Sequence, residues 1–148
     1  MDLFNQINTH KYLYLDKLIE EKDLELVLWI SEAGVVENND KALGDASSYG
    51  AIETSDLSKR YKMTFDNYVA FSIRNESYTE WDDDEIFSGN LFRKYSKSKF
   101  LDYVSASVNT WLVEQLRERA HSHIGIVCLN HVIDIAVCEE PIIEEIES

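Results

Sequence analysis

The chain of 148 residues contains one proline, five glycines and two cysteines. These low counts limit the number of domains and the cellular compartment that we expect. With Pro141 alone and few glycines there is little material for a flexible linker, so we expect one compact domain over residues 1–148. Cys128 and Cys138 are too few for a disulfide scaffold. The expected compartment is therefore the reducing cytoplasm.

Long apolar runs are also absent. The longest, Leu26–Ile30, is far too short to cross a bilayer. The N-terminus lacks the basic flank and apolar core of a signal peptide. We therefore expect no membrane association.

Basic residues are scarce, at 14 against 28 acidic residues, which gives a formal net charge of −14. This charge repels nucleic-acid phosphates and attracts a basic protein, so we expect a protein partner with a basic surface and no nucleic acid. Apolar residues make up 45% of the chain and aromatics 11%, a composition typical of a folded domain rather than a disordered one.

Apolar periodicity predicts two principal helices. Phe4, Ile7 and Leu15 begin a stripe at helical spacing, with Thr9 as a candidate cap of a helix that runs to about Glu21. A second helix is expected from Ser98, as N-cap, to Ala120.

Alternating or β-branched apolar residues predict the strands, at Leu24–Ile30, Ala51–Thr54, Tyr61–Arg74, Ile124–Leu129 and Val132–Val137. We expect Tyr61–Arg74 to be one long strand, since its alternation continues through Asp66 and Asn67. Loops are expected at Gly34–Gly50 and Glu76–Asn90.

The last two predicted strands form a hairpin through a turn at Asn130 and His131, which places Leu129 opposite Val132. In that register Asp134 lies on the more polar face, where we expect it to be partly exposed. One face is wholly apolar and consists of Ile124, Ile126, Cys128, Ile133, Ile135 and Val137. On this core face the Cys128 thiol is expected to be inert.

Together these elements predict an α+β fold: a single domain with a mainly antiparallel sheet of about five strands and two principal helices on one face. An acidic tail is expected from about residue 139. Strand order and oligomeric state do not follow from the sequence.

The predicted hairpin suggests a weak candidate metal site. His121, His123 and Cys138 fall on one face of it, and imidazole and thiolate are ligands that Zn²⁺ accepts. Because the three lack a standard ligand spacing, ordinary residues at a helix–strand junction are the favoured interpretation, and we expect no metal or other cofactor.

An acidic segment with aromatic residues is the strongest candidate for partner binding. Aromatics are enriched at the energetic centres of protein interfaces, and neighbouring carboxylates select a basic partner. The candidate residues are Tyr78, Trp81, Asp82, Asp83, Asp84 and Glu85. The spacing of these acids does not match a calcium-binding loop.

A basic stretch at the expected start of the second helix is a weaker candidate for anion binding, because a helix N-terminus with nearby cations attracts negative charge. Its residues are Arg93, Lys94, Lys97 and Lys99. The alternative is a solvated stretch that balances the acidic segment.

No nucleophile elbow, phosphate-binding glycine loop or zinc-protease helix is present in the sequence, so a non-catalytic role ranks first. In size and acidity the chain is similar to the immunity proteins that neutralise bacterial toxins, which implies an acidic domain that neutralises or regulates a basic partner. The alternative is a small-molecule or anion binder that uses the basic stretch and Gly34–Gly50. A metal-dependent enzyme is third.

Overall fold

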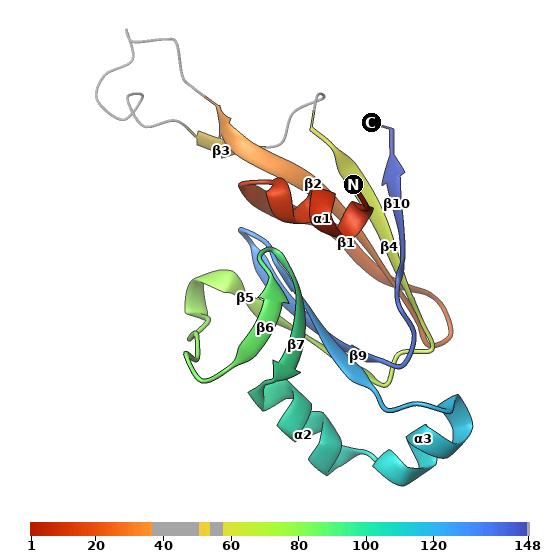
Figure 1. The fold of residues 1–148 in the computed structure, drawn as a ribbon. Coiled ribbons are helices and arrows are strands. Elements are labelled where there is room, and N and C mark those ends of the chain that lie inside the picture. Colours follow the sequence, from red (N-terminus) through yellow and green to blue (C-terminus); the bar gives the residue numbers. More distant parts are fainter. Residues whose placement is uncertain (37–50, 54–57, 148) are drawn as a thin grey trace, which may run out of the picture.

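Two antiparallel sheets pack face to face, and two helices cover the outer side of one of them (Figure 1). This arrangement is seen in a computed structural model that describes residues 1–36, 51–53 and 58–147. The predicted α+β class, with antiparallel pairing in a single domain, is confirmed. The strands are divided between two sheets rather than collected in one.

The first sheet combines the two ends of the chain. Its strands are β1 (Tyr12–Lys22), β2 (Glu25–Val36), β4 (Arg60–Asp66) and β10 (Ile142–Ile146), in that spatial order, with β3 (Ala51–Glu53) also paired to β2. β10 lies in the acidic segment predicted as a tail. It is instead a sheet strand, because Ile143 packs against the core while Glu144 and Glu145 remain exposed.

The second sheet carries the candidate site. Its spatial order is β5 (Ala70–Asn75), β9 (His131–Val137), β8 (Ser122–Val127), β7 (Phe92–Lys97) and β6 (Ile86–Gly89). A short 3-10 helix, η3 (Glu76–Tyr78), follows β5. The predicted loop Glu76–Asn90 therefore contains η3 and β6 as well as irregular backbone.

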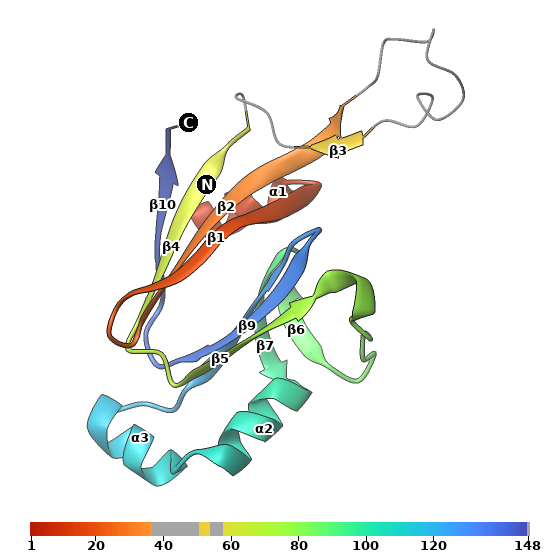
Figure 2. The ribbon, with the colours of Figure 1, turned by 180° about the vertical axis from the view of Figure 1, so that it is seen from behind.

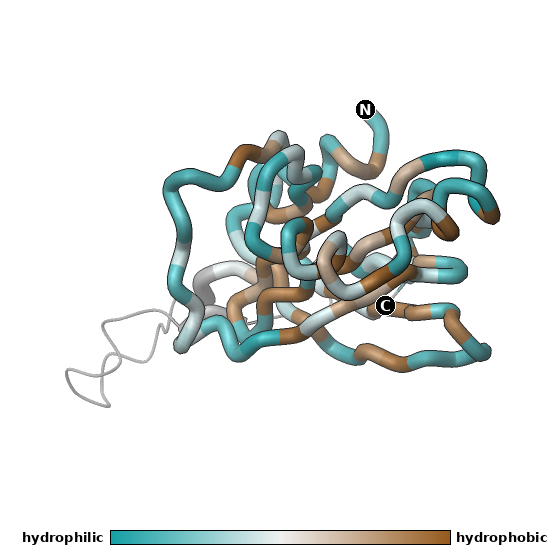
Figure 3. The backbone as a smooth tube through the Cα atoms, turned by 90° about the horizontal axis from the view of Figure 1, so that it is seen from below, coloured by the Kyte–Doolittle hydropathy of each residue, from teal (hydrophilic) through white to brown (hydrophobic). Residues whose placement is uncertain are grey.

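The core fills the space between the sheets, since alternate residues of each strand point inward. Helix α1 (Leu3–Thr9) lies at the open end between the sheets (Figure 2), where Ile7 is fully buried and the ring of Phe4 meets that of Phe92 edge-on at 5.2 Å. Hydrophobic and hydrophilic residues alternate along much of the backbone, and the outer bends of the chain are mostly hydrophilic (Figure 3). The largest fully buried side chains are Ile7, Leu13, Leu26, Leu28, Ile30, Tyr61, Met63, Phe65, Phe92, Ile126, Ile133 and Ile135.

The predicted helix ending at Glu21 is wrong beyond Thr9, which is the last residue of α1 rather than a cap at its start. Residues 12–22 form β1 because they pair along most of their length with β2, and Leu13 and Leu15 alternate into the core. Leu24 adopts a left-handed backbone (φ 61°) at the turn and is exposed. The strand predicted at Leu24–Ile30 is confirmed from Glu25 onward as part of β2, whereas Leu24 belongs to the turn.

The single strand predicted over Tyr61–Arg74 is also wrong. The chain turns at Asn67, whose φ of 50° breaks the extended backbone. The two halves do not form a hairpin either, since β4 pairs with β2 and β10 whereas β5 pairs with β9 in the other sheet. The short strand predicted at Ala51–Thr54 is present as β3 over Ala51–Glu53, and Thr54 lies outside the described residues. The predicted loop Gly34–Gly50 begins inside β2 and otherwise lies outside the described residues.

The helix predicted from Ser98 to Ala120 is divided into α2 (Lys99–Ser107) and α3 (Thr110–Arg117). Val108 is extended, and Asn109 starts α3 by accepting the backbone N–H of Leu112. The predicted N-cap is confirmed: the Ser98 side chain accepts the N–H of Leu101. The apolar side chains of α3 do not reach the core, and Trp111, Leu112 and Leu116 are exposed.

The β8–β9 hairpin is confirmed, but its register is shifted by two residues from the prediction. Val132 pairs with Val127, and the Cys128 N–H bonds to the carbonyl oxygen of His131 at 2.8 Å to close a longer turn. Because side chains alternate with a period of two, an even shift leaves every residue on its predicted face. The predicted apolar face is buried, and burial raises the pKa of the Cys128 thiol, which keeps it protonated and unreactive.

Candidate functional site

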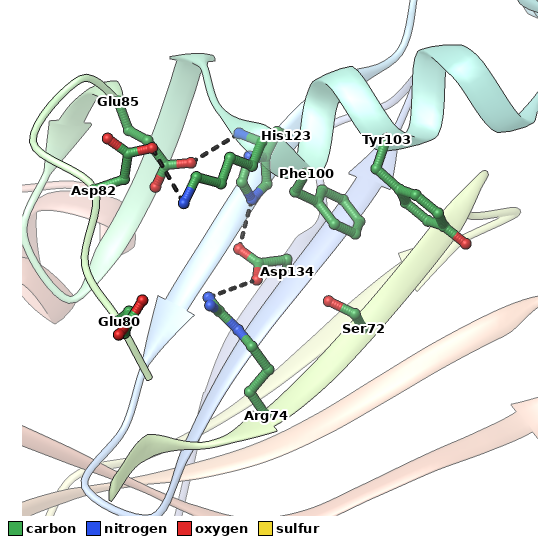
Figure 4. A pocket seen from close by; sticks show the side chains of 10 residues that line it. Ser72, Arg74, Glu80, Asp82, Glu85, Phe100, Tyr103, His123 and Asp134 are labelled. Atoms are coloured by element: carbon green, nitrogen blue, oxygen red, sulfur yellow. Dashed lines mark hydrogen bonds and ion pairs between the residues drawn. The ribbon is translucent and has the colours of Figure 1, made fainter. Parts of the chain in front are cut away.

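A pocket of about 270 Å³ lies over the outer face of the second sheet, between α2 and the acidic segment (Figure 4). Residues 80–85 form one wall, and Phe100 and Tyr103 of α2 form another. Ser72, Arg74 and Asp134 come from the sheet beneath. The complete lining is Ser72, Arg74, Glu80, Asp82, Glu85, Lys99, Phe100, Tyr103, His123 and Asp134.

Asp134 and His123 form a buried pair at the base of this pocket. Asp134 Oδ1 lies 2.6 Å from His123 Nε2, and the other ring nitrogen, Nδ1, lies 2.7 Å from Ser98 Oγ. All three residues are at least 95% buried. Ser98 Oγ accepts the Leu101 N–H and still has a hydroxyl proton that it can donate to Nδ1. In that arrangement the imidazole donates its Nε2–H to Asp134. Every polar group in this Ser98–His123–Asp134 chain of hydrogen bonds, here called the relay, then has a partner.

Strand alternation brings these side chains together on the outer face. Asp134 pairs across the sheet with Gly125, and His123 pairs with Tyr95. The Tyr95 ring stacks on the imidazole, with centroids 4.2 Å apart and planes 9° apart. Only glycine fits at Gly125, because a Cβ there would lie 2.7 Å from a ring carbon of Tyr95. Burial raises the pKa of Tyr95, so its hydroxyl stays neutral.

A serine, a histidine and an aspartate joined in series invite comparison with a hydrolytic triad. In that mechanism the serine oxygen must attack a bound substrate. Ser98 is buried and does not line the pocket, and its Oγ caps helix α2. The relay therefore anchors α2 to the sheet, and its geometry does not support nucleophilic catalysis.

Asp134 also reaches the pocket through its second oxygen. Oδ2 lies 3.2 Å from a terminal nitrogen of Arg74, whose side chain is about half exposed. Figure 4 shows Asp134 between His123 above it and Arg74 below it. The carboxylate thus links the buried relay to the open part of the pocket.

The acidic wall is held in place by the start of α2. Asp82 contacts Lys99 Nζ at 3.4 Å, and Glu85 accepts the backbone N–H of Lys99 at 2.9 Å. Asp82 also accepts the N–H of Asp84 at 2.9 Å. This backbone hydrogen bond, with help from Lys99, lowers the pKa of the Asp82 carboxyl. The contacts that depend on the carboxylate are therefore complete above the ordinary pKa of aspartate and are lost as the pH falls through its lower folded value.

The other residues predicted for partner binding lie on the outside of this wall. Tyr78 and Trp81 are 85% and 47% exposed, and Asp83 and Asp84 face solvent. The Arg93 guanidinium lies 5.0 Å from the centroid of the Trp81 ring, a cation–π contact that fixes the indole at the surface. The structure thus brings the predicted aromatic and acidic residues together around one loop.

The residues predicted for anion binding do not converge. Arg93 covers Trp81, whereas Lys94 contacts Glu140 at 3.2 Å and Lys99 contacts Asp82. Arg93 and Lys94 are adjacent on β7 and so point to opposite faces of the sheet. Lys97 is exposed near the end of that strand. The N-terminus of α2, expected to attract an anion, already holds Glu85.

The three residues of the weak metal candidate are not assembled into a site. His123 is bonded through both ring nitrogens, and the ring of His121 lies 3.4 Å from Ser105 Oγ. Cys138 pairs with neither histidine, because the register shift places Ala136 opposite His123. Within the described part of the chain, no three His, Cys, Asp or Glu side chains are grouped to hold a metal ion.

Treatment with a chelator is therefore expected to leave the melting temperature unchanged, since a structural metal would contribute directly to the free energy of folding. Differential scanning fluorimetry with and without EDTA measures this, and His121→Ala serves as the matched variant. A large drop on chelation that zinc restores, and that His121→Ala reproduces, would contradict this interpretation.

Asp134 is buried, whereas the sequence predicts a partly exposed position for it. The sequence also does not place Arg74, Tyr103 or Ser72 in a site. One signal was present: Asp134 is the only charged residue in the otherwise apolar run Val132–Val137. A carboxylate in such a run requires buried partners.

No family model, curated protein or solved structure matches the chain. Among the described residues, no helix has the length and apolar character needed to span a bilayer.

Proposed function

We propose that the protein is a non-catalytic acidic domain that binds a basic protein partner and neutralises or regulates it, in the manner of an immunity protein. The contact surface is the loop of residues 78–85. The observation that carries the proposal is that this loop is fixed to α2 through Asp82 and Glu85 while Tyr78 and Trp81 remain exposed. Exposed aromatics on a fixed loop are typical of an interface.

Charge supports a basic partner. The chain carries a net charge of −14, and Asp83 and Asp84 are exposed carboxylates without an ion-pair partner among the described residues. An acidic surface of this kind accelerates the encounter with a basic protein at low salt.

Trp81 is the proposed anchor. The contact with Arg93 holds the indole before binding, so little side-chain entropy is lost on association. Tryptophan is among the residues most enriched at the energetic centres of interfaces. The proposed compartment is the cytoplasm of a bacterium, a setting that fits the two free, buried thiols of Cys128 and Cys138.

The kinetics of complex formation test this proposal. A partner is first captured from the native cell and identified, and its association and dissociation rates are then measured by surface plasmon resonance. Converting Asp83 and Asp84 to Asn is expected to slow association, most strongly at low salt, because rim charges act on encounter. Asp82 is left unchanged so that the loop stays attached to Lys99. Trp81→Ala is expected to speed dissociation, by about thirtyfold if the anchor contributes ~2 kcal/mol.

Matched controls separate the loop from general charge and hydrophobicity. Glu21→Gln with Asp23→Asn removes the same charge at the β1–β2 turn, and Trp111→Ala removes an exposed tryptophan from α3. The controls should leave the rates nearly unchanged. Rates for the loop variants equal to those of the wild type, with the same captured partner, would remove the loop from the interface.

A further inference from the structure

We propose that the pocket between the acidic loop and α2 receives one arginine side chain of the basic partner. This inference rests on the proposed function and specifies how the partner is recognised. It assigns a role to Asp134 and Tyr103, which lie outside the loop of residues 78–85, and to Glu80, which belongs to that loop.

The charge of the lining favours a cation. Four carboxylates line the pocket, from Glu80, Asp82, Glu85 and Asp134, against two cations, Arg74 and Lys99. The Arg74 side chain is half-exposed and can turn toward solvent as a ligand enters, whereas Lys99 stays paired with Asp82.

The size favours a single side chain. Pockets for small molecules and cofactors occupy roughly 300–1,000 Å³. At about 270 Å³, this pocket lies at the lower end of that range. It suits one extended side chain delivered by a protein surface better than a free cofactor.

Free acceptor capacity remains inside the pocket. An ionised carboxylate offers about four lone-pair positions, and Asp134 makes one contact through each oxygen, to His123 and Arg74. The Glu80 carboxylate makes no hydrogen bond or ion pair within the described residues. Two carboxylates with unused acceptors, Glu80 on the loop wall and Asp134 at the base, can share the several N–H donors of one guanidinium.

The aromatic wall distinguishes arginine from lysine. Phe100 and Tyr103 project from α2, with Phe100 next to Asp134 and Tyr103 beyond it at the edge of the pocket (Figure 4). The Tyr103 side chain is 65% exposed and has its ring available at the pocket edge. A planar guanidinium stacks on an aromatic face while its edge binds carboxylates, whereas an ammonium is a compact and strongly hydrated charge.

The experiment uses the folded protein and small probes, so it does not need the partner. N-acetyl-arginine methylamide is titrated against ¹⁵N-labelled protein, and chemical shifts report the site and its affinity. The expected result is saturable shifts at residues 72–74, 80–85, 99–103, 123 and 134. The neutral citrulline analogue should give none, and the lysine analogue should bind several-fold more weakly.

Two variants with a matched control test the residues. Glu80→Gln and Tyr103→Ala are each expected to weaken arginine binding about threefold, the range for a single partly exposed ion pair or cation–π contact. Glu114→Gln, which removes an exposed charge from α3, should leave the affinity unchanged. Both variants are expected to fold, because neither side chain makes a hydrogen bond to the rest of the described chain. Spectra recorded without the probe check this.

Four results would overturn the inference: saturable binding of inorganic phosphate in place of the arginine probe, equal shifts with citrulline, lysine binding as tightly as arginine, or equal affinity in Glu80→Gln and Glu114→Gln. None of these would affect the test of the loop, since that test depends on the rates measured for Trp81, Asp83 and Asp84. Failure of the pocket and failure of the proposed function are therefore distinguishable.

Discussion

Replacing Ile133 by alanine is expected to lower the free energy of unfolding by ~2–5 kcal/mol, because the substitution removes buried methyl groups and leaves a cavity. Ile133 is fully buried on β9, between the two sheets. Its side chain belongs to the core cluster that includes residues of both sheets and α1, so the surroundings have little freedom to collapse. Urea unfolding monitored by tryptophan fluorescence or circular dichroism gives the value.

The neighbouring strand supplies a matched control for this substitution. Ile73 pairs directly with Ile133 on the same sheet face, but it is 43% exposed. Ile73→Ala removes the same atoms and should cost no more than ~1.5 kcal/mol, since less apolar surface is returned to water. Equal destabilisation by the two substitutions would show that the face between β5 and β9 is not packed as described.

Replacing Asp134 by alanine is expected to lower the free energy of unfolding by about 3 kcal/mol, because it leaves the buried His123 Nε2 without a partner. The loss should extend to α2, since His123 joins Asp134 to the cap residue Ser98. Hydrogen exchange is the measurement that separates the two effects: relative to the wild type, exchange in the variant should accelerate more for amides of α2 than for those of α3.

Arg74→Ala is the control for Asp134, because it removes the other partner of the same carboxylate. The Arg74 side chain is about half exposed, so water replaces it and the cost should stay below ~1 kcal/mol. A similar loss of stability in the two variants, or an α2 that exchanges normally without Asp134, would contradict the assignment of the relay as the anchor of that helix.

Two local features of the structure, the cap of α2 and the apolar face of the β8–β9 hairpin, were predictable from the residues that form them. Ser98 caps a helix as expected, since a serine side chain satisfies backbone N–H groups wherever a helix starts. The apolar face of the β8–β9 hairpin was predicted even though its register was not. The two-residue shift changes which residues pair, for example Val127 instead of Leu129 with Val132, but it leaves each side chain on the same face.

The two wrong secondary-structure predictions, the helix to Glu21 and the single strand Tyr61–Arg74, share one physical cause. The spacing of Leu15, Leu18 and Ile19 fits a helix as well as a strand. These residues form a strand because they pair with β2, and local spacing does not show that pairing. Similarly, the alternation from Tyr61 to Arg74 continues across Asn67, while the chain passes from one sheet to the other. Local periodicity reports which side of an element is apolar, not which sheet it joins.

For the candidate site, the sequence by itself determined the acidic charge, the exposed aromatic loop and the absence of catalytic motifs. The pocket was decided only by the tertiary structure. Asp134, Arg74, Glu80 and Tyr103 come from four separate segments, and they meet because β5 and β9 pair and α2 lies over them. The burial of a carboxylate depends on the partners that surround it in space, and for Asp134 those partners, His123 and Arg74, are 11 and 60 residues away in sequence.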